Sequence, residues 1–177
     1  MISQTCEYET TRLSIGGWHG MQLPPSVDLP GVVCKVLTDA VTRSLPPSWH
    51  GPYSRARARA WIDERDAESA TLLALDRASG EPVGFVILSE HSVGDEHDRV
   101  DLRLGYLLAE SAWGRGLASE LVEGLVRWCR SQPSILSITG GVAGDNIASA
   151  RVLTKNGFTA IGPVHDGEQI YRLSLLR

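Results

Sequence analysis

Residues 113–119, WGRGLAS, place two glycines at the start of a segment whose apolar spacing predicts a helix. Glycine inside a helix costs about 1 kcal/mol relative to alanine, so Gly114 and Gly116 indicate a backbone that a ligand must approach closely. The unpaired N–H groups of a first helical turn, with the helix dipole behind them, attract anions. We therefore interpret the segment as a cradle for a pyrophosphate, the alternative being a tight strand-to-helix turn without a ligand.

Two other phosphate-binding loops fit these residues less well. The nucleoside-triphosphate loop G-x-x-x-x-G-K-[ST] is excluded because no Gly-Lys pair occurs anywhere in the chain. The dinucleotide fingerprint G-x-G-x-x-[GA] is a weak match because Ser119 occupies its last glycine position. The acidic residue that this fingerprint needs is also missing from the SITGG stretch that follows.

The chain around this segment alternates between the apolar patterns of strands and of helices. Asp166 and Gly167 form the expected turn of a final hairpin, and Gly157 is the expected left-handed cap of the preceding helix. The order predicts one α/β (α+β) domain over residues 1–177, with a mixed central sheet of about six to seven strands flanked by helices. Strands are predicted at residues 10–15, 98–109 and 134–142, hairpins at 70–90 and 158–176, and helices at 27–44, 54–67, 117–129 and 146–157.

The composition is that of a globular protein with a slight acidic excess. Its 177 residues include 17 basic and 21 acidic side chains, a net charge of −4, which does not favour binding to nucleic acid or to an anionic membrane. Cys6, Cys34 and Cys129 lack the spacing of a metal or redox site, so we expect no metal and a reducing compartment. With no secretory signal and no apolar run of about 18 residues, the expected location is the cytoplasm.

The glycine-rich segment and a second one share a known pattern. Residues 104–125 and 144–162 together resemble the core of the GNAT superfamily of acyl-CoA-dependent N-acyltransferases. The resemblance is closer to its Rim-type branch, the ribosomal-protein alanine N-acetyltransferases. In the family's coenzyme loop, [QR]-x-x-G-x-[GA], Gly116 and Ala118 match, and Trp113 stands where Gln or Arg is usual, a replacement common in this branch.

The second segment matches the branch's pattern N-x-x-S followed by K-x-G-F. The likeness is strong over residues 99–162 and extends more weakly over most of the chain. Two spaced motifs in the correct order, each preceded by a predicted strand, are far more specific than one glycine loop. The matching residues are Asn146, Ser149, Lys155, Gly157 and Phe158.

The resemblance implies that acetyl-CoA is the acyl donor and that its pyrophosphate lies on the amides of residues 114–119. Its pantetheine arm would follow the strand that ends near Leu108, and Asn146 would contact the pantetheine amides or else only cap its helix. The amine would attack the thioester directly, with no covalent enzyme intermediate, as the absence of a G-x-S-x-G elbow suggests. The implied coenzyme-binding residues are Leu107, Leu108, Trp113, Gly114, Arg115, Gly116, Leu117, Ala118, Ser119, Asn146 and Ser149.

The resemblance also implies catalytic roles. Ser149 is the candidate proton donor to the leaving thiolate, the alternative being a polar side chain satisfied by its own backbone. Relatives often carry a carboxylate just before the GY pair, where this chain has Arg103, and Asp101 is the nearest substitute as general base. His165 and Asp166 in the final hairpin are the next candidates, and water is a further one.

The acceptor is predicted to be a primary amine, preferably a protein N-terminal α-amine. An amine with a pKa of about 7.8 loses its proton at neutral pH at much lower cost than a lysine amine with a pKa of about 10.4. The alternatives are a small-molecule amine, another donor such as succinyl-CoA, or a non-catalytic CoA-binding module. The resemblance also raises the expectation of a homodimer, which is common among relatives.

Three further sets of residues each have a structural and a functional interpretation. Residues 45–53, LPPSWHGPY, are a candidate lid over the acceptor. The alternating Arg55, Arg57 and Arg59 are expected on an exposed helix edge, rather than in contact with coenzyme phosphate or RNA. The charged stretch 89–98 lacks the spacing of a metal site, so we expect a solvated hairpin loop, the alternative being a role in steering a cationic acceptor.

Overall fold

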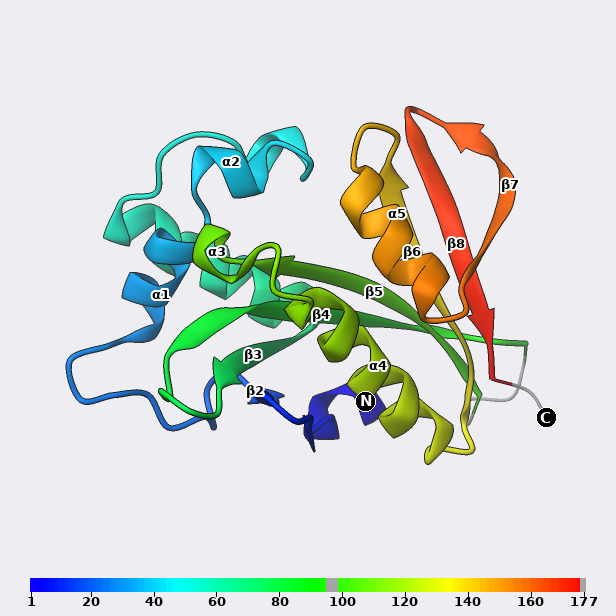
Figure 1. The fold of residues 1–177 in the computed structure, drawn as a ribbon, viewed down its shortest axis with the longest axis horizontal. Helices are drawn as coiled ribbons and strands as arrows, with labels where there is room; N and C mark the ends of the chain where they lie inside the picture. Colours follow the sequence, from blue (N-terminus) through cyan, green and yellow to red (C-terminus); the bar gives the residue numbers. More distant parts are fainter. Residues whose placement is uncertain (95–98, 176–177) are drawn as a thin grey trace.

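The computed structural model describes residues 1–94 and 99–175, and its strands form one mixed sheet (Figure 1). The strand order is β1-β2-β3-β4-β5-β6-β8-β7. Within the described chain, β5 and β6 are parallel and the other neighbours are antiparallel. The strands are β1 Tyr8–Glu9, β2 Leu13–Gly17, β3 Ala70–Asp76, β4 Pro82–Ser92, β5 Val100–Leu108, β6 Ile135–Ala143, β7 Thr159–His165 and β8 Glu168–Ser174.

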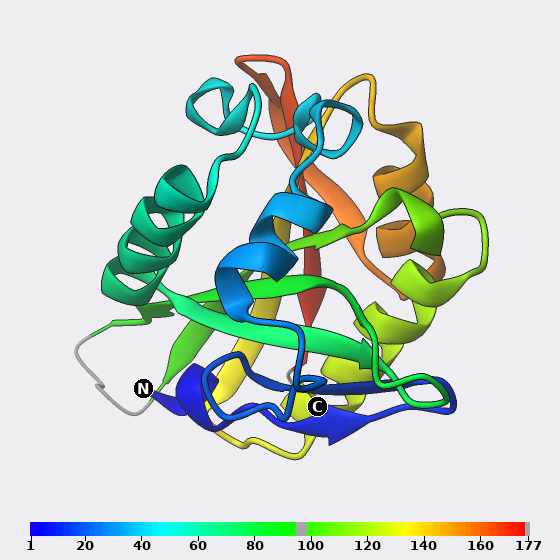
Figure 2. The same cartoon turned by 90° about the vertical axis from the view of Figure 1, so that its left-hand side faces the viewer.

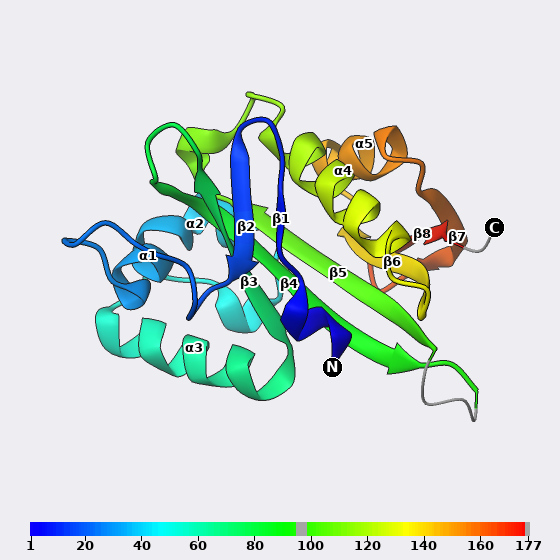
Figure 3. The same cartoon turned by 90° about the horizontal axis from the view of Figure 1, so that it is seen from below.

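The helices cover both faces of this sheet. Figure 3 shows α1 and α3 on one side of the strands and α4 and α5 on the other, and Figure 2 shows α1 and α3 side by side in front of the sheet. The α-helices are α1 Leu29–Val36, α2 Asp39–Thr42, α3 Arg55–Glu68, α4 Leu117–Arg130 and α5 Ile147–Lys155. Short 3-10 helices are η1 Ile2–Thr5, η2 Pro47–Trp49 and η3 Glu110–Ala112.

Each face of the sheet carries its own apolar core because side chains alternate along a strand. On β3, for example, Leu72 packs in the core beneath α4, and its neighbour Leu73 packs in the core beneath α1 and α3. The α4 core includes Leu121 and Leu125, both fully buried. The sheet is therefore a rigid plate held from both sides.

The predicted fold class is confirmed, with one strand more than the expected six to seven. The additional strand, β1, has 2 residues, too few to leave an alternating pattern in the sequence. The first predicted strand, residues 10–15, is found as β2, Leu13–Gly17, because the Thr10 hydroxyl accepts a hydrogen bond from Leu13 N–H in a turn before the strand. The final hairpin is confirmed, with Asp166 and Gly167 at φ of 50° and 79°, as is the left-handed Gly157 at 87°.

The prediction of a single helix over residues 27–44 is wrong. The chain forms α1 and α2 instead, separated at Leu37 and Thr38. Thr38 is the N-cap of α2, and its side chain accepts a hydrogen bond from Val41 N–H. The apolar three-and-four spacing continues across the break because Leu37 is also buried, so the pattern alone gave no sign of the interruption.

The sheet is split open between its two parallel strands. The β5–β6 pairing runs from Val100 with Ile135 to Arg103 with Thr139, and in the described chain it goes no further. Beyond Arg103, β5 stays paired with β4 while β6 continues along β8, and Figure 1 shows the two strands diverging. One side of the last part of β5, residues 104–108, therefore faces an opening rather than a strand.

The hairpin of β1 and β2 packs against α4 at Gly124. A Cβ on Gly124 would lie 2.6 Å from the Tyr8 ring and 2.8 Å from the Thr10 methyl group. The Tyr8 hydroxyl donates a hydrogen bond of 3.0 Å to the Leu121 carbonyl one turn earlier in the helix. Gly124 therefore allows a strand from the start of the chain to approach the helix that follows the glycine-rich segment.

This close approach predicts that Gly124→Ala changes the free energy of unfolding in the direction opposite to the usual one for a helical glycine. In an exposed helix interior, Gly→Ala stabilises by about 1 kcal/mol. We expect Gly124→Ala to destabilise by about 1–3 kcal/mol instead, because the methyl group overpacks against Tyr8. Urea unfolding measures the change, and Glu123→Ala on the exposed side of α4 is the control, expected within about 0.5 kcal/mol of wild type. A more stable Gly124→Ala protein would contradict this packing.

Candidate active site

Helix α4 begins without a side-chain cap. Its N-cap is Gly116, at φ 76° and ψ 6°, whereas the N-caps of α1, α3 and α5 are Asp28, Ser54 and Asn146, each with a side chain that accepts a backbone N–H. The first helical hydrogen bond of α4 runs from Glu120 N–H to the Gly116 carbonyl, at 3.2 Å. The amides of residues 117–119 precede it and have no carbonyl one turn back within the helix. This is the backbone arrangement that binds anions.

A cavity of about 540 Å³ lies in front of this helix start. Its walls come from the open side of β5, the glycine-rich segment, the first turn of α5 and the α2 region. Of the predicted coenzyme-binding residues, all but Arg115 line it, although they come from three separate segments. Those present are Leu107, Leu108, Trp113, Gly114, Gly116, Leu117, Ala118, Ser119, Asn146 and Ser149.

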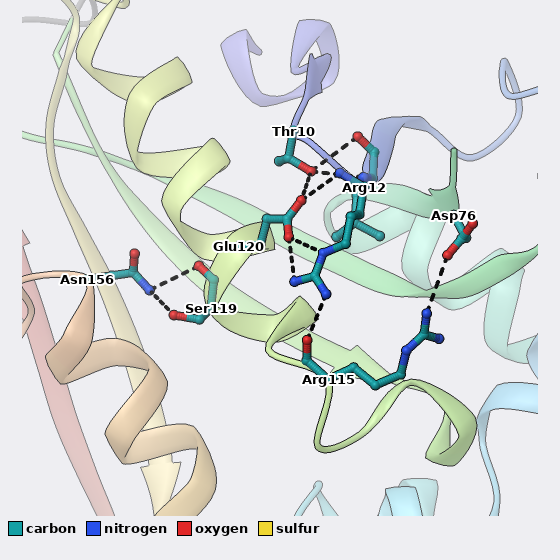
Figure 4. Close-up of polar contacts among 8 residues, drawn as sticks. Thr10, Arg12, Asp76, Arg115, Ser119, Glu120 and Asn156 are labelled. Atoms are coloured by element: carbon teal, nitrogen blue, oxygen red, sulfur yellow. Dashed lines mark hydrogen bonds and ion pairs between the residues drawn. The ribbon is translucent and has the colours of Figure 1, made fainter. Parts of the chain in front are cut away.

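Trp113 ties the glycine-rich segment to β5. Its indole Nε1 donates a hydrogen bond of 2.9 Å to the Leu108 carbonyl, while the side chain remains half-exposed at the cavity. Arg115 instead turns away from the cavity, with Nη2 3.8 Å from an Asp76 carboxylate oxygen (Figure 4). The backbone of Arg115 is held separately, because its carbonyl accepts a hydrogen bond of 2.9 Å from Arg12 Nη1.

Ser149 pairs with a tyrosine that the sequence analysis left without a role. The Ser149 and Tyr106 hydroxyl oxygens are 2.8 Å apart, and either can be the donor. Burial raises the pKa of Tyr106, and the Ser149 hydrogen bond only partly offsets this, so the phenol keeps its proton at neutral pH. The Ser149 N–H donates to the Asn146 side-chain oxygen at 3.1 Å, which makes Asn146 the cap of α5.

A second cavity, of about 430 Å³, adjoins the first. It is lined by the diverging strands β5 and β6, the final hairpin, residues 45–47 of the candidate lid and Ser44 just before the lid. The final hairpin contributes His165, Asp166 and Glu168. His165 and Asp166 lie within 3.1 Å of each other, but their side chains are almost fully exposed.

Asp101 lies apart from both cavities. It is absent from the residues that line them, and its carboxylate accepts a hydrogen bond from the Ser137 hydroxyl and lies 3.3 Å from Arg172 Nη2. The structure places a different carboxylate in the second cavity, that of Glu168, whose oxygen is 3.6 Å from Arg103 Nη2. Arg103 occupies the position at which relatives often have an acidic residue, and it forms an ion pair with Glu168 of β8.

Sequence reasoning missed Glu168 and Tyr106. Glu168 carries no motif, and its place depends on β8 pairing with β6 across the opening. Tyr106 was within reach, because it has the same strand parity as Leu102 and Leu104, which face α4. That parity puts it on the helix-covered side where α5 carries Ser149.

The other candidate groups are structural or lie outside the description. Arg57 Nη2 donates to the carbonyls of Ser48 and His50, at 3.2 and 2.7 Å, and so holds the candidate lid instead of standing free on a helix edge. Residues 95–98 of the charged stretch lie outside the described residues. In the described part of the chain no three His, Cys, Asp or Glu side chains gather as a metal site would require, and no helix has the length and apolarity to cross a bilayer.

Comparison with known proteins identifies the family. Residues 22–159 match the family model described as an acetyltransferase (GNAT) domain. The chain belongs to the GNAT family of acetyltransferases. It is accordingly an acetyl-CoA-dependent N-acetyltransferase. No curated protein matches the chain in sequence.

Solved structures of GNAT proteins share the fold at low identity. A GNAT-family acetyltransferase from Bacillus anthracis is 16% identical, with a TM-score of 0.74 over 96% of this chain and 99% of that one. RimL, a ribosomal L7/L12 alpha-N-protein acetyltransferase in complex with coenzyme A, is 19% identical, with a TM-score of 0.67 over 93% and 95%. YncA, a putative acetyltransferase from Salmonella typhimurium with acetyl-CoA, is 16% identical, with a TM-score of 0.60 over 93% and 95%.

The residues of this GNAT enzyme suit its donor. A diphosphate needs backbone N–H groups that no side chain occupies, and the glycine N-cap of α4 leaves such groups at the cavity wall. A pantetheine arm needs backbone partners, and residues 104–108 of β5 face the opening of the sheet. The cavity of about 540 Å³ joins these two features.

The role of the left-handed N-cap Gly116 in coenzyme binding can be tested directly. Gly116→Ala strains the backbone by about 1–2 kcal/mol, because an L side chain disfavours φ near +76°. We expect coenzyme A affinity, measured by calorimetry, to fall by about tenfold as the loop relaxes out of its binding shape.

The matched control for this variant is Gly80→Ala. Gly80 has nearly the same φ, 73°, with open space around it, but it lies in the β3–β4 turn and lines neither cavity. We expect a similar loss of stability and unchanged coenzyme affinity. Equal affinities for all three proteins would show that the conformation of Gly116 does not matter for the coenzyme.

Proposed function

We propose that residues 1–177 form a single N-acetyltransferase domain that transfers acetyl from acetyl-CoA to a protein N-terminal α-amine by direct attack. The observation that carries this proposal is the meeting of the two cavities. Tyr106, Asn146 and Ser149 line both, so the hydroxyl pair lies where a donor in the first cavity would face an acceptor in the second. We place the enzyme in the cytoplasm, which suits its three free cysteines.

The donor side of the reaction depends on backbone groups. The amides of residues 114–119 bind the diphosphate, and the Asn146 side chain, whose oxygen already accepts from Ser149 N–H, retains its amide hydrogens for a pantetheine carbonyl. The backbone at Leu107 and Leu108 holds the thioester carbonyl. Bound acetyl-CoA supplies an activated acyl group, and donors aimed at the developing oxyanion each lower the barrier by about 3 kcal/mol.

The hydroxyl pair supplies the proton that the departing thiolate needs. Ser149 donates it, Tyr106, 2.8 Å away, passes its own proton to Ser149 through their shared hydrogen bond, and solvent water then reprotonates the Tyr106 phenolate. The raised pKa of Tyr106 keeps this reserve proton in place at neutral pH. The two hydroxyls act as one unit because each is the other's hydrogen-bond partner.

Glu168 is the proton acceptor that the geometry favours for the incoming amine. Its carboxylate lines the second cavity, whereas Asp101 lines neither cavity and is already occupied by Ser137 and Arg172. The Arg103 guanidinium, with Nη2 3.6 Å from a Glu168 oxygen, forms an ion pair with this carboxylate. An α-amine with a pKa of about 7.8 needs only a weak base of this kind.

The second cavity suits a cationic amine of either kind, a protein α-amine or a small molecule. Glu168 and Asp166 give its rim an acidic character that attracts an ammonium group. RimL, among the similar structures, is described as acting on the α-amine of a ribosomal protein, and another is described as a putative phosphinothricin N-acetyltransferase. A small-molecule amine is therefore the second candidate acceptor.

An acceptor screen tests the proposed function. N-terminal peptides, lysine peptides and small amines are incubated with acetyl-CoA or succinyl-CoA, and products are read by intact mass. We expect one acetyl group on the α-amine of peptides and faster release of thiol with acetyl-CoA than with succinyl-CoA. Acetylation of small amines alone would replace the protein acceptor with the second candidate.

Removal of the hydroxyls tests the proton donor. We expect Ser149→Ala and Tyr106→Phe each to lower kcat by about a hundredfold while the KM for acetyl-CoA changes little. The double variant should lose little more than either single one, because the two groups act as a unit. Wild-type turnover in Ser149→Ala would remove the proposed role.

Paired carboxylate variants distinguish the two candidate bases. We expect Glu168→Gln to lower kcat/KM by about a hundredfold at pH 7, with partial recovery at high pH where the amine is already neutral. Asp101→Asn should retain nearly full activity, because its carboxylate points into neither cavity. The reverse result would assign the base to Asp101.

A further inference from the structure

A carboxylate lies beside the turn that the proposed function assigns to the diphosphate. Glu120 is in the first turn of α4, directly after the free amides of residues 117–119, and its side chain is 16% exposed. A negative charge next to an anion site opposes binding of the coenzyme unless another group neutralises it. The surroundings of Glu120 therefore bear on the donor site.

Among the described residues, the polar contacts of the Glu120 carboxylate all come from the turn before β2 (Figure 4). One oxygen accepts hydrogen bonds of 2.7 Å from both the Thr10 hydroxyl and the Arg12 N–H. The other is 2.6 Å from Arg12 Nε and 2.6 Å from Arg12 Nη2. The guanidinium thus contacts one carboxylate oxygen through two nitrogens, while the other oxygen accepts from the Thr10 hydroxyl and the Arg12 N–H.

The remaining nitrogen of Arg12 contacts the glycine-rich segment itself. Arg12 Nη1 donates a hydrogen bond of 2.9 Å to the Arg115 carbonyl, and a Cβ on Gly116 would lie 3.6 Å from Nη2. The same guanidinium therefore touches the carbonyl that directly precedes the left-handed cap. One side chain joins the charge beside the helix to the shape of the loop.

The pKa of Glu120 shows that this neutralisation is effective. Burial alone would raise the pKa, but the hydrogen bonds from Thr10 and Arg12 and the charge of Arg12 outweigh it and hold the pKa below its ordinary value. Glu120 is therefore ionised at neutral pH, and its charge is matched by Arg12 rather than by the helix start. The free amides of α4 are left to an external anion.

We propose that Arg12 is a positioning residue for the coenzyme: it neutralises Glu120 and fixes the Arg115 carbonyl, so that the first-turn amides of α4 are presented to the diphosphate without a competing charge. The proposal rests on the proposed function, because it takes the coenzyme to bind at this helix start. Arg12 acts through the loop and Glu120 and has no assigned part in the chemical step. Its removal should therefore affect donor binding rather than turnover at saturation.

The test is a charge cycle of Arg12→Gln, Glu120→Gln and the double variant, with acetyl-CoA affinity measured by calorimetry. We expect Arg12→Gln to weaken binding by roughly five- to tenfold, since it leaves the charge of the Glu120 carboxylate without a counter-charge beside the anion. Glu120→Gln should bind at least as tightly as wild type, because it removes the negative charge beside the anion site while its one oxygen can still accept from the Thr10 hydroxyl and the Arg12 backbone N–H. The double variant should recover most of the affinity lost in Arg12→Gln.

Recovery in the double variant is the decisive result, because a purely structural clamp gives the opposite. If Arg12 and Glu120 only hold the fold, the double variant binds coenzyme as weakly as Arg12→Gln or more weakly. This outcome overturns the proposal. Unchanged affinity in Arg12→Gln also overturns it. Arg12→Lys should fall between, since lysine keeps the charge but cannot reach the carboxylate and the Arg115 carbonyl together.

Two controls separate charge from folding and from the proposed function. Arg77→Gln removes an equally exposed arginine that bonds the Thr10 carbonyl and faces Glu9, and its coenzyme affinity should equal that of wild type. S-acetylpantetheine, which has no phosphates, should serve as donor equally well in wild type and Arg12→Gln, with kcat unchanged. If wild type itself binds no coenzyme A, the proposed function fails, whereas binding by wild type with no effect of Arg12 defeats only this inference.

Discussion

The site depends on the start of α4, where, in the described part of the chain, no side chain caps the backbone amides. The amides at the beginning of α4 would ordinarily be satisfied by a Ser, Thr, Asp or Asn cap, as those of α1, α3 and α5 are. A left-handed glycine takes that place, and it both turns the chain and keeps side-chain atoms away from the amides. Such a helix is less stable alone, and it is held by its buried face, by the β1–β2 hairpin and by Asn156, which donates to the Ser119 carbonyl at 3.2 Å (Figure 4).

The split between β5 and β6 opens the cavity that the start of α4 lines. A continuous sheet would pair every backbone group of β5, whereas the divergence beyond Arg103 leaves one side of residues 104–108 facing two adjoining cavities. Tyr106 and Ser149 meet where the cavities join, so the fold brings the two cavities and a pair of hydroxyl groups together. The antiparallel strands on either side keep this opening fixed in shape.

How far the sequence could predict this arrangement depended on the range of the interactions. The glycine-rich segment and the α5 cap are local patterns, and their residues line one cavity as a group. The partner of Ser149 is 43 residues away, and Arg12 is 108 residues from Glu120, distances at which no spacing rule applies. The break between α1 and α2 was hidden by the buried Leu37, and Glu168 takes its place only through the β6–β8 pairing.

The central claim is that the free amides at the start of α4 bind the diphosphate of the donor. A crystal structure of the protein with coenzyme A measures this most directly. The account predicts diphosphate oxygens within hydrogen-bond distance of backbone nitrogens of residues 114–119, with the pantetheine arm along β5. A coenzyme whose diphosphate is bound by side chains elsewhere, with those amides facing solvent, would contradict it.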